Sequence, residues 1–163
     1  MHIMEHKPFD VFLDLDGVFA DFNGKIKELT GFEPVDLPKK ELWKTVYRQH
    51  DFFASLALME GAELLWAYFK PFKPIFLTGA PQGAAMQAQK IEWVKEKFGH
   101  EWVTIVLPRK DKQLHSGPNK LLVDDQERNI EEWVSKGGYG ILHKGDAKDT
   151  IAQVEELRIA ITL

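Results

Sequence analysis

Short apolar runs alternate with amphipathic segments along most of the chain. Five runs rich in β-branched and aromatic residues predict strands, at residues 10–16, 74–78, 103–107, 121–124 and 139–143. After the second run, apolar residues recur at helical spacing and predict helices at residues 84–98, 130–135 and 149 or 150 to 158. Strands that alternate with helices indicate an α/β fold, with a parallel sheet covered by helices on both faces.

A long segment separates the first two predicted strands. Residues 18–72 contain three helical patterns, at residues 22–29, 39–47 and 62–69. The segment is too long for a simple crossover and too short for an independent domain. We therefore predict a small helical cap, residues 18–72, inserted after the first strand into a core formed by residues 1–17 and 73–163.

Two aspartates stand at the end of the first apolar run. Asp14 and Asp16 follow Val11-Phe12-Leu13 and precede Gly17, which permits a sharp turn. Side chains two positions apart on a strand share one face, so the carboxylates are predicted to lie close together. Two such charges stay ionised only beside a cation, unless one carboxyl keeps its proton. The pattern indicates a catalytic or metal-binding strand end; the alternative is a solvated aspartate pair in a turn.

Polar residues also follow the second and fourth runs. Thr78 and Gly79 could bind an anionic oxygen, although Thr78 could instead cap the helix that follows. Asp124 and Asp125 could complete an oxygen cage for Mg²⁺. The basic segment 109–112 could supply a cation to a phosphate site, or could simply be solvated. The carboxyl ends of parallel strands lie at one edge of the sheet, where ligands bind. We therefore expect the polar residues that follow these runs to lie close together at that edge.

This ordered set of motifs resembles the haloacid dehalogenase (HAD) superfamily of phosphotransferases. The stretch Asp14-Leu15-Asp16-Gly17-Val18, continued by residues 19–22, is similar to the first motif of the 5'(3')-deoxyribonucleotidases. Residues 51–56, followed by residues 59–62, are similar to the return from the cap in that family. The resemblance implies a Rossmann-like HAD core with a five-stranded parallel sheet and a helical cap.

The resemblance also implies catalytic roles. Asp14 would be the nucleophile that forms an aspartyl-phosphate, and Asp16 the general acid and then the general base. Thr78 and the backbone of Gly79 would bind phosphate oxygens. Lys112 would be the phosphate-site lysine, if the family's loop has a short insertion here; Lys110 and Lys120 are the alternatives. The implied Mg²⁺ ligands and their supports are Asp14, the carbonyl oxygen of Asp16, Asp124 and Asp125.

Aromatic residues of the cap bear on the substrate. The resemblance implies that Phe22 and Trp43, with Phe52 and Phe53 as additions, sandwich a nucleobase; the alternative is that these rings pack the cap. The expected function is a Mg²⁺-dependent phosphomonoester hydrolase acting on (deoxy)nucleoside monophosphates. A phosphatase for another small metabolite, such as a sugar phosphate, and a non-catalytic nucleotide-binding protein are the alternatives.

Composition limits the other possibilities. The 163 residues carry a formal charge of −4, which does not favour binding of a nucleic-acid polymer or a nucleic-acid 3'-end phosphatase. Cysteine is absent, and no apolar run is long enough for a membrane span or a signal peptide. We expect a cytoplasmic protein without a membrane partner, either a monomer or a homodimer.

Overall fold

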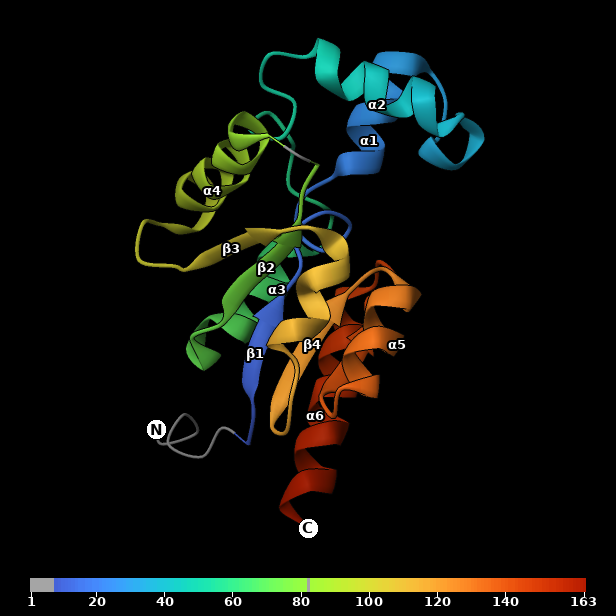
Figure 1. The fold of residues 1–163 in the computed structure, drawn as a ribbon. Coiled ribbons are helices and arrows are strands. Elements are labelled where there is room, and N and C mark those ends of the chain that lie inside the picture. Colours follow the sequence, from blue (N-terminus) through green and yellow to red (C-terminus); the bar gives the residue numbers. More distant parts are fainter. Residues whose placement is uncertain (1–7, 82) are drawn as a thin grey trace.

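Parallel strands form the centre of the molecule. The computed structural model describes residues 8–81 and 83–163. In this part of the chain, five strands form one parallel sheet in the order β3-β2-β1-β4-β5 (Figure 1). The strands are β1 (Asp10–Leu13), β2 (Ile75–Gly79), β3 (Thr104–Leu107), β4 (Lys120–Asp124) and β5 (Tyr139–Leu142). The predicted α/β fold with a five-stranded parallel sheet is confirmed. Because the chain leaves the central β1 toward β2 and later returns beside it as β4, the switch point of the topology lies at the end of β1.

Helices connect and cover the strands. The α-helices are α1 (Phe22–Thr30), α2 (Lys39–Arg48), α3 (Ala62–Phe69), α4 (Ala84–Phe98), α5 (Glu127–Ser135) and α6 (Ala147–Thr162). The 3₁₀ segments are η2 (Pro34–Asp36), η3 (Lys70–Phe72) and η4 (Arg109–His115). Helix α6 begins before the predicted start because the Asp146 carboxylate caps it, accepting from the N–H groups of Lys148 and Asp149. Among the described residues, no helix is both long enough and apolar enough to cross a bilayer.

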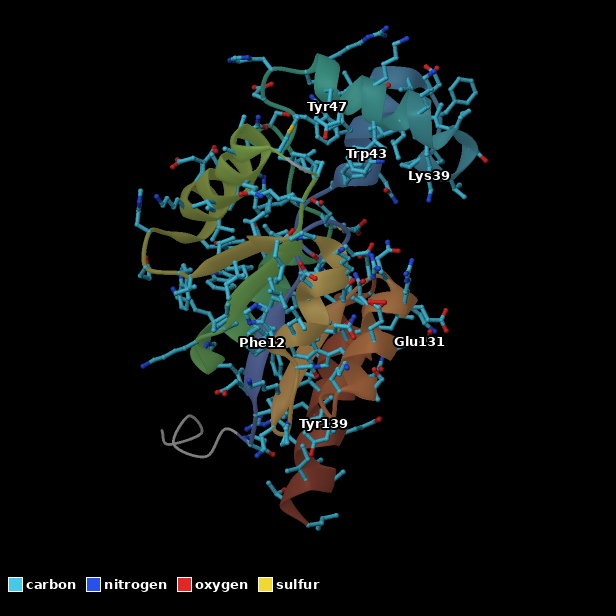
Figure 2. All side chains as sticks on the ribbon, viewed as in Figure 1. Phe12, Lys39, Trp43, Tyr47, Glu131 and Tyr139 are labelled. Atoms are coloured by element: carbon cyan, nitrogen blue, oxygen red, sulfur yellow. The ribbon has the colours of Figure 1, made fainter. Side chains whose placement is uncertain are left out.

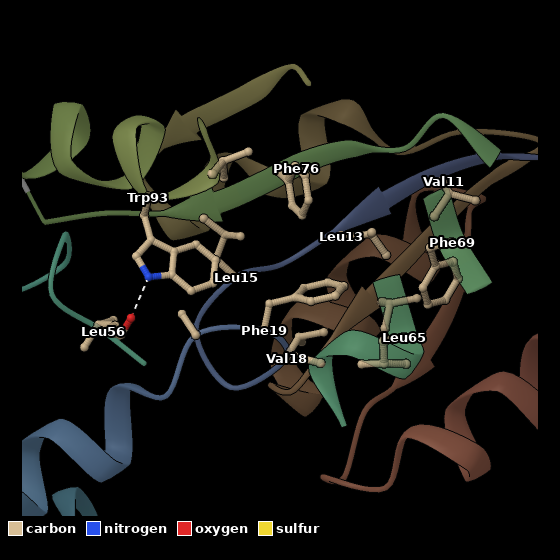
Figure 3. Packing of buried hydrophobic residues seen from close by; sticks show 14 of the residues in the cluster. Val11, Leu13, Leu15, Val18, Phe19, Leu56, Leu65, Phe69, Phe76 and Trp93 are labelled. Carbon is tan, nitrogen blue, oxygen red and sulfur yellow. Dashed lines mark hydrogen bonds between the residues drawn. The ribbon is translucent and has the colours of Figure 1, made fainter. Parts of the chain in front are cut away.

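Alternate residues of the strands face two different layers. Val11 and Leu13 of β1 pack in the same buried cluster as residues of α3, α4 and α6 (Figure 3). Phe12 belongs to a second cluster on the opposite face, with Trp133 of α5, and the two rings lie 5.3 Å apart. The Asp14 N–H still donates to the carbonyl oxygen of Val123 on β4, at 3.0 Å. The alternation therefore continues to Asp14, which shares the face of Phe12.

The predicted cap is divided in the structure. Helices α1 and α2 rise above the carboxyl edge of the sheet, whereas α3 packs beside α6 (Figure 1). The two connections to the raised part run side by side, since Asp21 N–H donates to Ala57 O (2.9 Å) and Met59 N–H to Phe19 O (2.8 Å). The last predicted part of the cap lies instead on the core, because α3 buries the apolar side chains of Ala62, Leu65 and Phe69 there. Residues 22–56 are called the cap below.

Candidate active site

A buried lysine lies between two aspartates at the carboxyl edge of the sheet. Lys112 Nζ, from η4, is 2.9 Å from Asp14 Oδ1 and 2.8 Å from Asp124 Oδ2. All three side chains are almost fully buried. Burial alone would lower the pKa of Lys112, but the two carboxylates raise it overall, so the ammonium stays charged. Of the three lysines that the sequence analysis named, the structure brings Lys112 to Asp14; Lys110 is exposed and Lys120 begins β4.

Further hydrogen bonds fix the carboxylate of Asp124. Its Oδ1 accepts from the N–H of Gln126 at 2.9 Å, and its Oδ2 accepts from Asn129 Nδ2 at 3.1 Å. The Asn129 side-chain oxygen in turn accepts from Arg109, which also contacts Glu132 at 2.9 Å. The sequence reasoning missed Asn129 and the role of Arg109. Asn129 and Trp133 are the buried residues of α5 and lie one helical turn apart. A polar residue on the apolar face of this helix is the sequence pattern that could have revealed Asn129.

Three carboxylates could hold a metal ion. Single oxygen atoms of Asp14, Asp124 and Asp125 all lie within 4.8 Å of one another. Burial, followed by the charges of Asp14 and Asp124, raises the pKa of Asp125. Burial and the charge of Asp14 also raise the pKa of Asp124, against the lowering effect of Lys112. A divalent cation relieves this repulsion, and carboxylates are the ligands that Mg²⁺ prefers, so the donor set fits the ion.

The turn after β1 holds one of these carboxylates in place. Gly17 has a φ of +83°, and any Cβ there would overlap the carboxylate of Asp125. The N–H groups of residues 18–20 converge on the carbonyl oxygen of Leu15, at 3.1, 2.8 and 2.9 Å. The glycine therefore serves both the turn and the close approach of Asp125.

A comparison of two glycine variants tests this packing. Gly31 also has a positive φ, +80°, but nothing lies within 4 Å of where its Cβ would be. Gly17→Ala and Gly31→Ala should each lose about 1–2 kcal/mol of unfolding free energy from backbone strain. Only Gly17→Ala should also displace Asp125 and weaken Mg²⁺ binding, by roughly 10–100-fold. Urea unfolding and titration calorimetry measure the two effects, and equal Mg²⁺ affinity in both variants would contradict the expectation.

Asp16 turns away from the metal-ligand cluster. The strand period predicts Asp14 and Asp16 on one strand face, but β1 ends before both, and Asp16 lies outside the group of three carboxylates although it lines the same cavity as Asp14. Asp16 Oδ2 instead accepts from Lys90 Nζ of α4 at 2.7 Å. Burial raises the pKa of Asp16, Lys90 lowers it and Asp14 raises it again, with a net rise. The Asp16 side chain remains 30% exposed, so a bound molecule can reach it.

Thr78 and Gly79 lie next to Asp16, at the end of β2. The Thr78 side chain is buried, and its Oγ1 accepts from Lys90 Nζ at 2.9 Å. Helix α4 begins after Gly83 without a side-chain cap, so Thr78 does not cap it. Gly79 lies against the backbone of Arg109, where a Cβ would be 3.2 Å from the Arg109 Cα.

Lys90 is the second residue that the sequence reasoning missed. Its side chain is only 2% exposed, and it lies in the buried stripe of α4 together with Met86, Trp93 and Val94. A lysine within an apolar stripe at helical spacing is the signal that could have revealed it, because an unpaired ammonium is rarely buried.

A cavity of about 460 Å³ opens over these groups. Asp14, Asp16 and Lys112 line it from the core, and Phe22, Trp43 and Phe53 line it from the cap. Figure 2 shows Trp43 on the raised helices, above the edge of the sheet. The structure thus brings the carboxylates and the aromatic rings to one cavity.

Phe52 lies elsewhere than the sequence analysis expected. It is fully buried and is absent from the cavity wall, where its neighbour Phe53 lies instead. The Phe52 ring supports Phe22 from behind, with ring centroids 5.4 Å apart. Of the two rings that the sequence names as additions, Phe53 therefore lines the cavity, whereas the chain turns Phe52 into the cap core.

Solved structures share this arrangement of elements. A HAD-superfamily hydrolase from Ehrlichia chaffeensis aligns with a TM-score of 0.56 and 12% identity, over 93% of this chain and 98% of that chain. The chain has the fold of HAD-superfamily hydrolases. A predicted phosphatase from Clostridium acetobutylicum gives 0.53 and 12%, over 91% and 98% of the two chains. A HAD family hydrolase from Deinococcus radiodurans R1, with bound phosphate and sodium, gives 0.52 and 15%, over 96% of both. Neither a protein-family model nor a curated protein matches the sequence.

Proposed function

We propose that the protein is a Mg²⁺-dependent phosphatase for small phosphomonoesters, acting through an aspartyl-phosphate on Asp14. The observation that carries the proposal is the cluster at the cavity floor, where Lys112 holds Asp14 at 2.9 Å beside Asp124 and Asp125. The HAD hydrolase fold supports it, since Asp14 follows β1 and Asp124 ends β4, the two strands on either side of the switch point. Ligands of open α/β sheets bind at this position.

The chemistry divides into two displacements. A carboxylate oxygen of Asp14 attacks the phosphorus, the bond to the ester oxygen breaks, and Asp16 gives its proton to that oxygen, releasing an alcohol. Water then attacks the phosphorus and gives a proton to Asp16, while the bond between phosphorus and Asp14 breaks. Inorganic phosphate leaves, and both aspartates return to their starting states. Lys112 and Thr78 provide hydrogen-bond donors to the phosphoryl oxygens.

The repulsion among the carboxylates explains the need for a cation. Asp14, Asp124 and Asp125, with the carbonyl oxygen of Asp16, would hold Mg²⁺, whose charge offsets the repulsion between the carboxylates and a phosphate dianion. Lys112 contributes a single positive charge, through its contacts with Asp14 and Asp124, against the three negative charges of this group.

The cap favours a nucleoside monophosphate as substrate. Phe22, Trp43 and Phe53 present aromatic surface to the cavity, and such faces stack on nucleobases. The Phe22 and Phe53 rings are 6.2 Å apart and nearly parallel, at 28°, so they form a continuous wall. The cap covers the cavity and so favours small substrates over phosphoproteins and nucleic-acid polymers.

Phosphate release from a substrate panel tests the proposal. The panel would contain nucleoside monophosphates, deoxynucleoside monophosphates and sugar phosphates, each assayed with Mg²⁺ and with EDTA. We expect Mg²⁺-dependent release and the highest kcat/KM for a nucleotide. A sugar phosphate preferred over every nucleotide would exclude the nucleotide assignment. Tight nucleotide binding without any turnover would instead support a non-catalytic binding protein.

Two aromatic residues one helical turn apart test the substrate site. Trp43 lines the cavity, whereas Tyr47 on the same helix is 53% exposed and does not. Trp43→Ala should raise KM for a nucleotide by roughly 5–100-fold, the equivalent of losing one stacked base, with little change in kcat. Its KM for glycerol phosphate should not change. Tyr47→Ala is the control and should leave both KM values as in the wild type. If Trp43→Ala instead raises KM for the nucleotide and for glycerol phosphate to the same extent, Trp43 has a packing role.

A further inference from the structure

The buried lysine on α4, Lys90, contacts Asp16, which lines the cavity, and Thr78, which is buried near the end of β2. We propose that Lys90 is a positioning residue, which orients the Asp16 carboxyl group and the Thr78 hydroxyl for phosphoryl transfer. This inference rests on the proposed phosphatase function and extends it to a residue outside the cavity wall.

The Lys90 ammonium contacts a carboxylate, a hydroxyl group and an aromatic ring of the protein. Nζ lies 2.7 Å from Asp16 Oδ2 and 2.9 Å from Thr78 Oγ1, and it sits 4.5 Å from the centre of the Phe53 ring. With 2% of the residue exposed, little water can replace these contacts. These contacts hold the ammonium in one position, and its hydrogen bonds therefore fix the side chains of Asp16 and Thr78.

The contact decides which oxygen of Asp16 carries the proton. An ammonium has three donors and no acceptor, so the oxygen it contacts, Oδ2, cannot be the one that presents an O–H group to it. In the acid form of Asp16 the proton therefore resides on Oδ1. When the O–H bond of Oδ1 breaks and the leaving oxygen gains that hydrogen, Lys90 stabilises the carboxylate that remains.

The second contact leaves the hydroxyl hydrogen of Thr78 available. Because Lys90 donates to Thr78 Oγ1, the hydroxyl must use its own hydrogen elsewhere. Its acceptor within the protein is the carbonyl oxygen of Gly79 at 3.4 Å, longer than an ordinary O–H···O bond. A phosphate oxygen at the cavity floor is a better acceptor, so Lys90 prepares Thr78 as a donor to the substrate.

Neighbouring residues of α4 keep the cap over Lys90. The side-chain oxygen of Gln89 accepts from the N–H groups of Phe53 and Ala54, at 2.9 and 3.3 Å. The indole N–H of Trp93 donates to the carbonyl oxygen of Leu56 at 2.8 Å (Figure 3). The Phe53 ring is thereby fixed over the ammonium and shields it from water.

The leaving group of the substrate provides the decisive test. p-Nitrophenolate leaves without needing a proton, whereas an alkoxide from an alkyl phosphate needs one. The readout is kcat/KM, which covers the steps up to the first phosphoryl transfer. Lys90→Met should lose roughly 10²–10³-fold on an alkyl phosphate, because the acid is no longer oriented, and less than about tenfold on p-nitrophenyl phosphate.

Two further variants control for the loss of a lysine. Lys95→Met removes a lysine of the same helix that is 38% exposed and pairs only loosely with Glu92, at 3.7 Å; it should retain wild-type kcat/KM. Lys90→Arg can donate to both partners and should recover part of the loss on the alkyl phosphate. Circular dichroism establishes whether each variant folds. If Lys90→Met does not fold, Lys90→Gln replaces it, and we expect the same selective loss on the alkyl phosphate.

The outcomes separate this inference from the proposed function. Selective loss on the alkyl phosphate supports a positioning role. Equal losses on the two substrates would overturn the orientation of Asp16, because a misplaced Thr78 affects both substrates alike, and no loss would overturn both roles of Lys90. Either result leaves the phosphatase function in place. A wild-type protein that turns over neither substrate would overturn the proposed function, and the role of Lys90 with it.

Discussion

Replacement of Asp14 by asparagine is expected to lower phosphate release by at least about 10⁴-fold. The amide is close in shape to the carboxylate but is a very poor nucleophile, so the aspartyl-phosphate cannot form at a useful rate. Lys112 keeps its contact with Asp124, 2.8 Å away, and one of the crowded charges is removed, so the variant should remain folded. The measurement is phosphate release from the best substrate of the panel, with Mg²⁺ present, on protein whose folding is established by circular dichroism.

Asp149→Asn is the matched control for this experiment. Asp149 is exposed on α6, where its carboxylate accepts a hydrogen bond from Gln153 at 2.9 Å. The variant should release phosphate at the wild-type rate. Residual activity of Asp14→Asn within tenfold of wild type would show that another group accepts the phosphoryl, or that water attacks it directly.

Local patterns sufficed to predict the strands, because parallel strands buried on both faces have apolar sequences of a recognisable length. The same patterns located Asp14, Thr78 and Asp124, since each follows an apolar run directly and parallel strands end at one edge. The pattern alone does not define the strand limits. It predicts that β1 continues to Asp16, whereas β1 ends at Leu13 and the chain then turns. The position of Asp16 outside the group of three carboxylates therefore could not be predicted from the strand period.

Tertiary packing decided what the sequence could not. Lys90 belongs to the periodic pattern of α4, yet its partners Asp16 and Thr78 come from other elements. Phe52 and Phe53 are adjacent and chemically equal, and only the path of the chain determines which ring faces the cavity. In each case the missing information is a contact between residues distant in sequence.

Lys112→Met should destabilise the protein more than any of the other substitutions. It leaves the buried carboxylates of Asp14 and Asp124 without the ammonium that now lies within 2.9 Å of both. Removing one partner of a buried ion pair costs about 3–5 kcal/mol, because the remaining charge stays desolvated and unpaired. Urea unfolding in EDTA should show a loss of this size, and phosphate release should fall by roughly 10²–10³-fold, as for other donors that stabilise a transition state.

Mg²⁺ distinguishes this electrostatic effect from a simple packing defect. A cation bound among Asp14, Asp124 and Asp125 replaces part of the missing positive charge, so the loss of unfolding free energy should be smaller in Mg²⁺ than in EDTA. Lys110→Met is the matched control, because Lys110 belongs to the same 3₁₀ segment but is exposed. It should change the unfolding free energy by less than about 0.5 kcal/mol in either condition. A loss in Lys112→Met that Mg²⁺ leaves unchanged would mean that the ion does not bind beside Asp14 and Asp124. A loss as small as that of Lys110→Met would mean that the two ion pairs of Lys112 do not stabilise the folded protein.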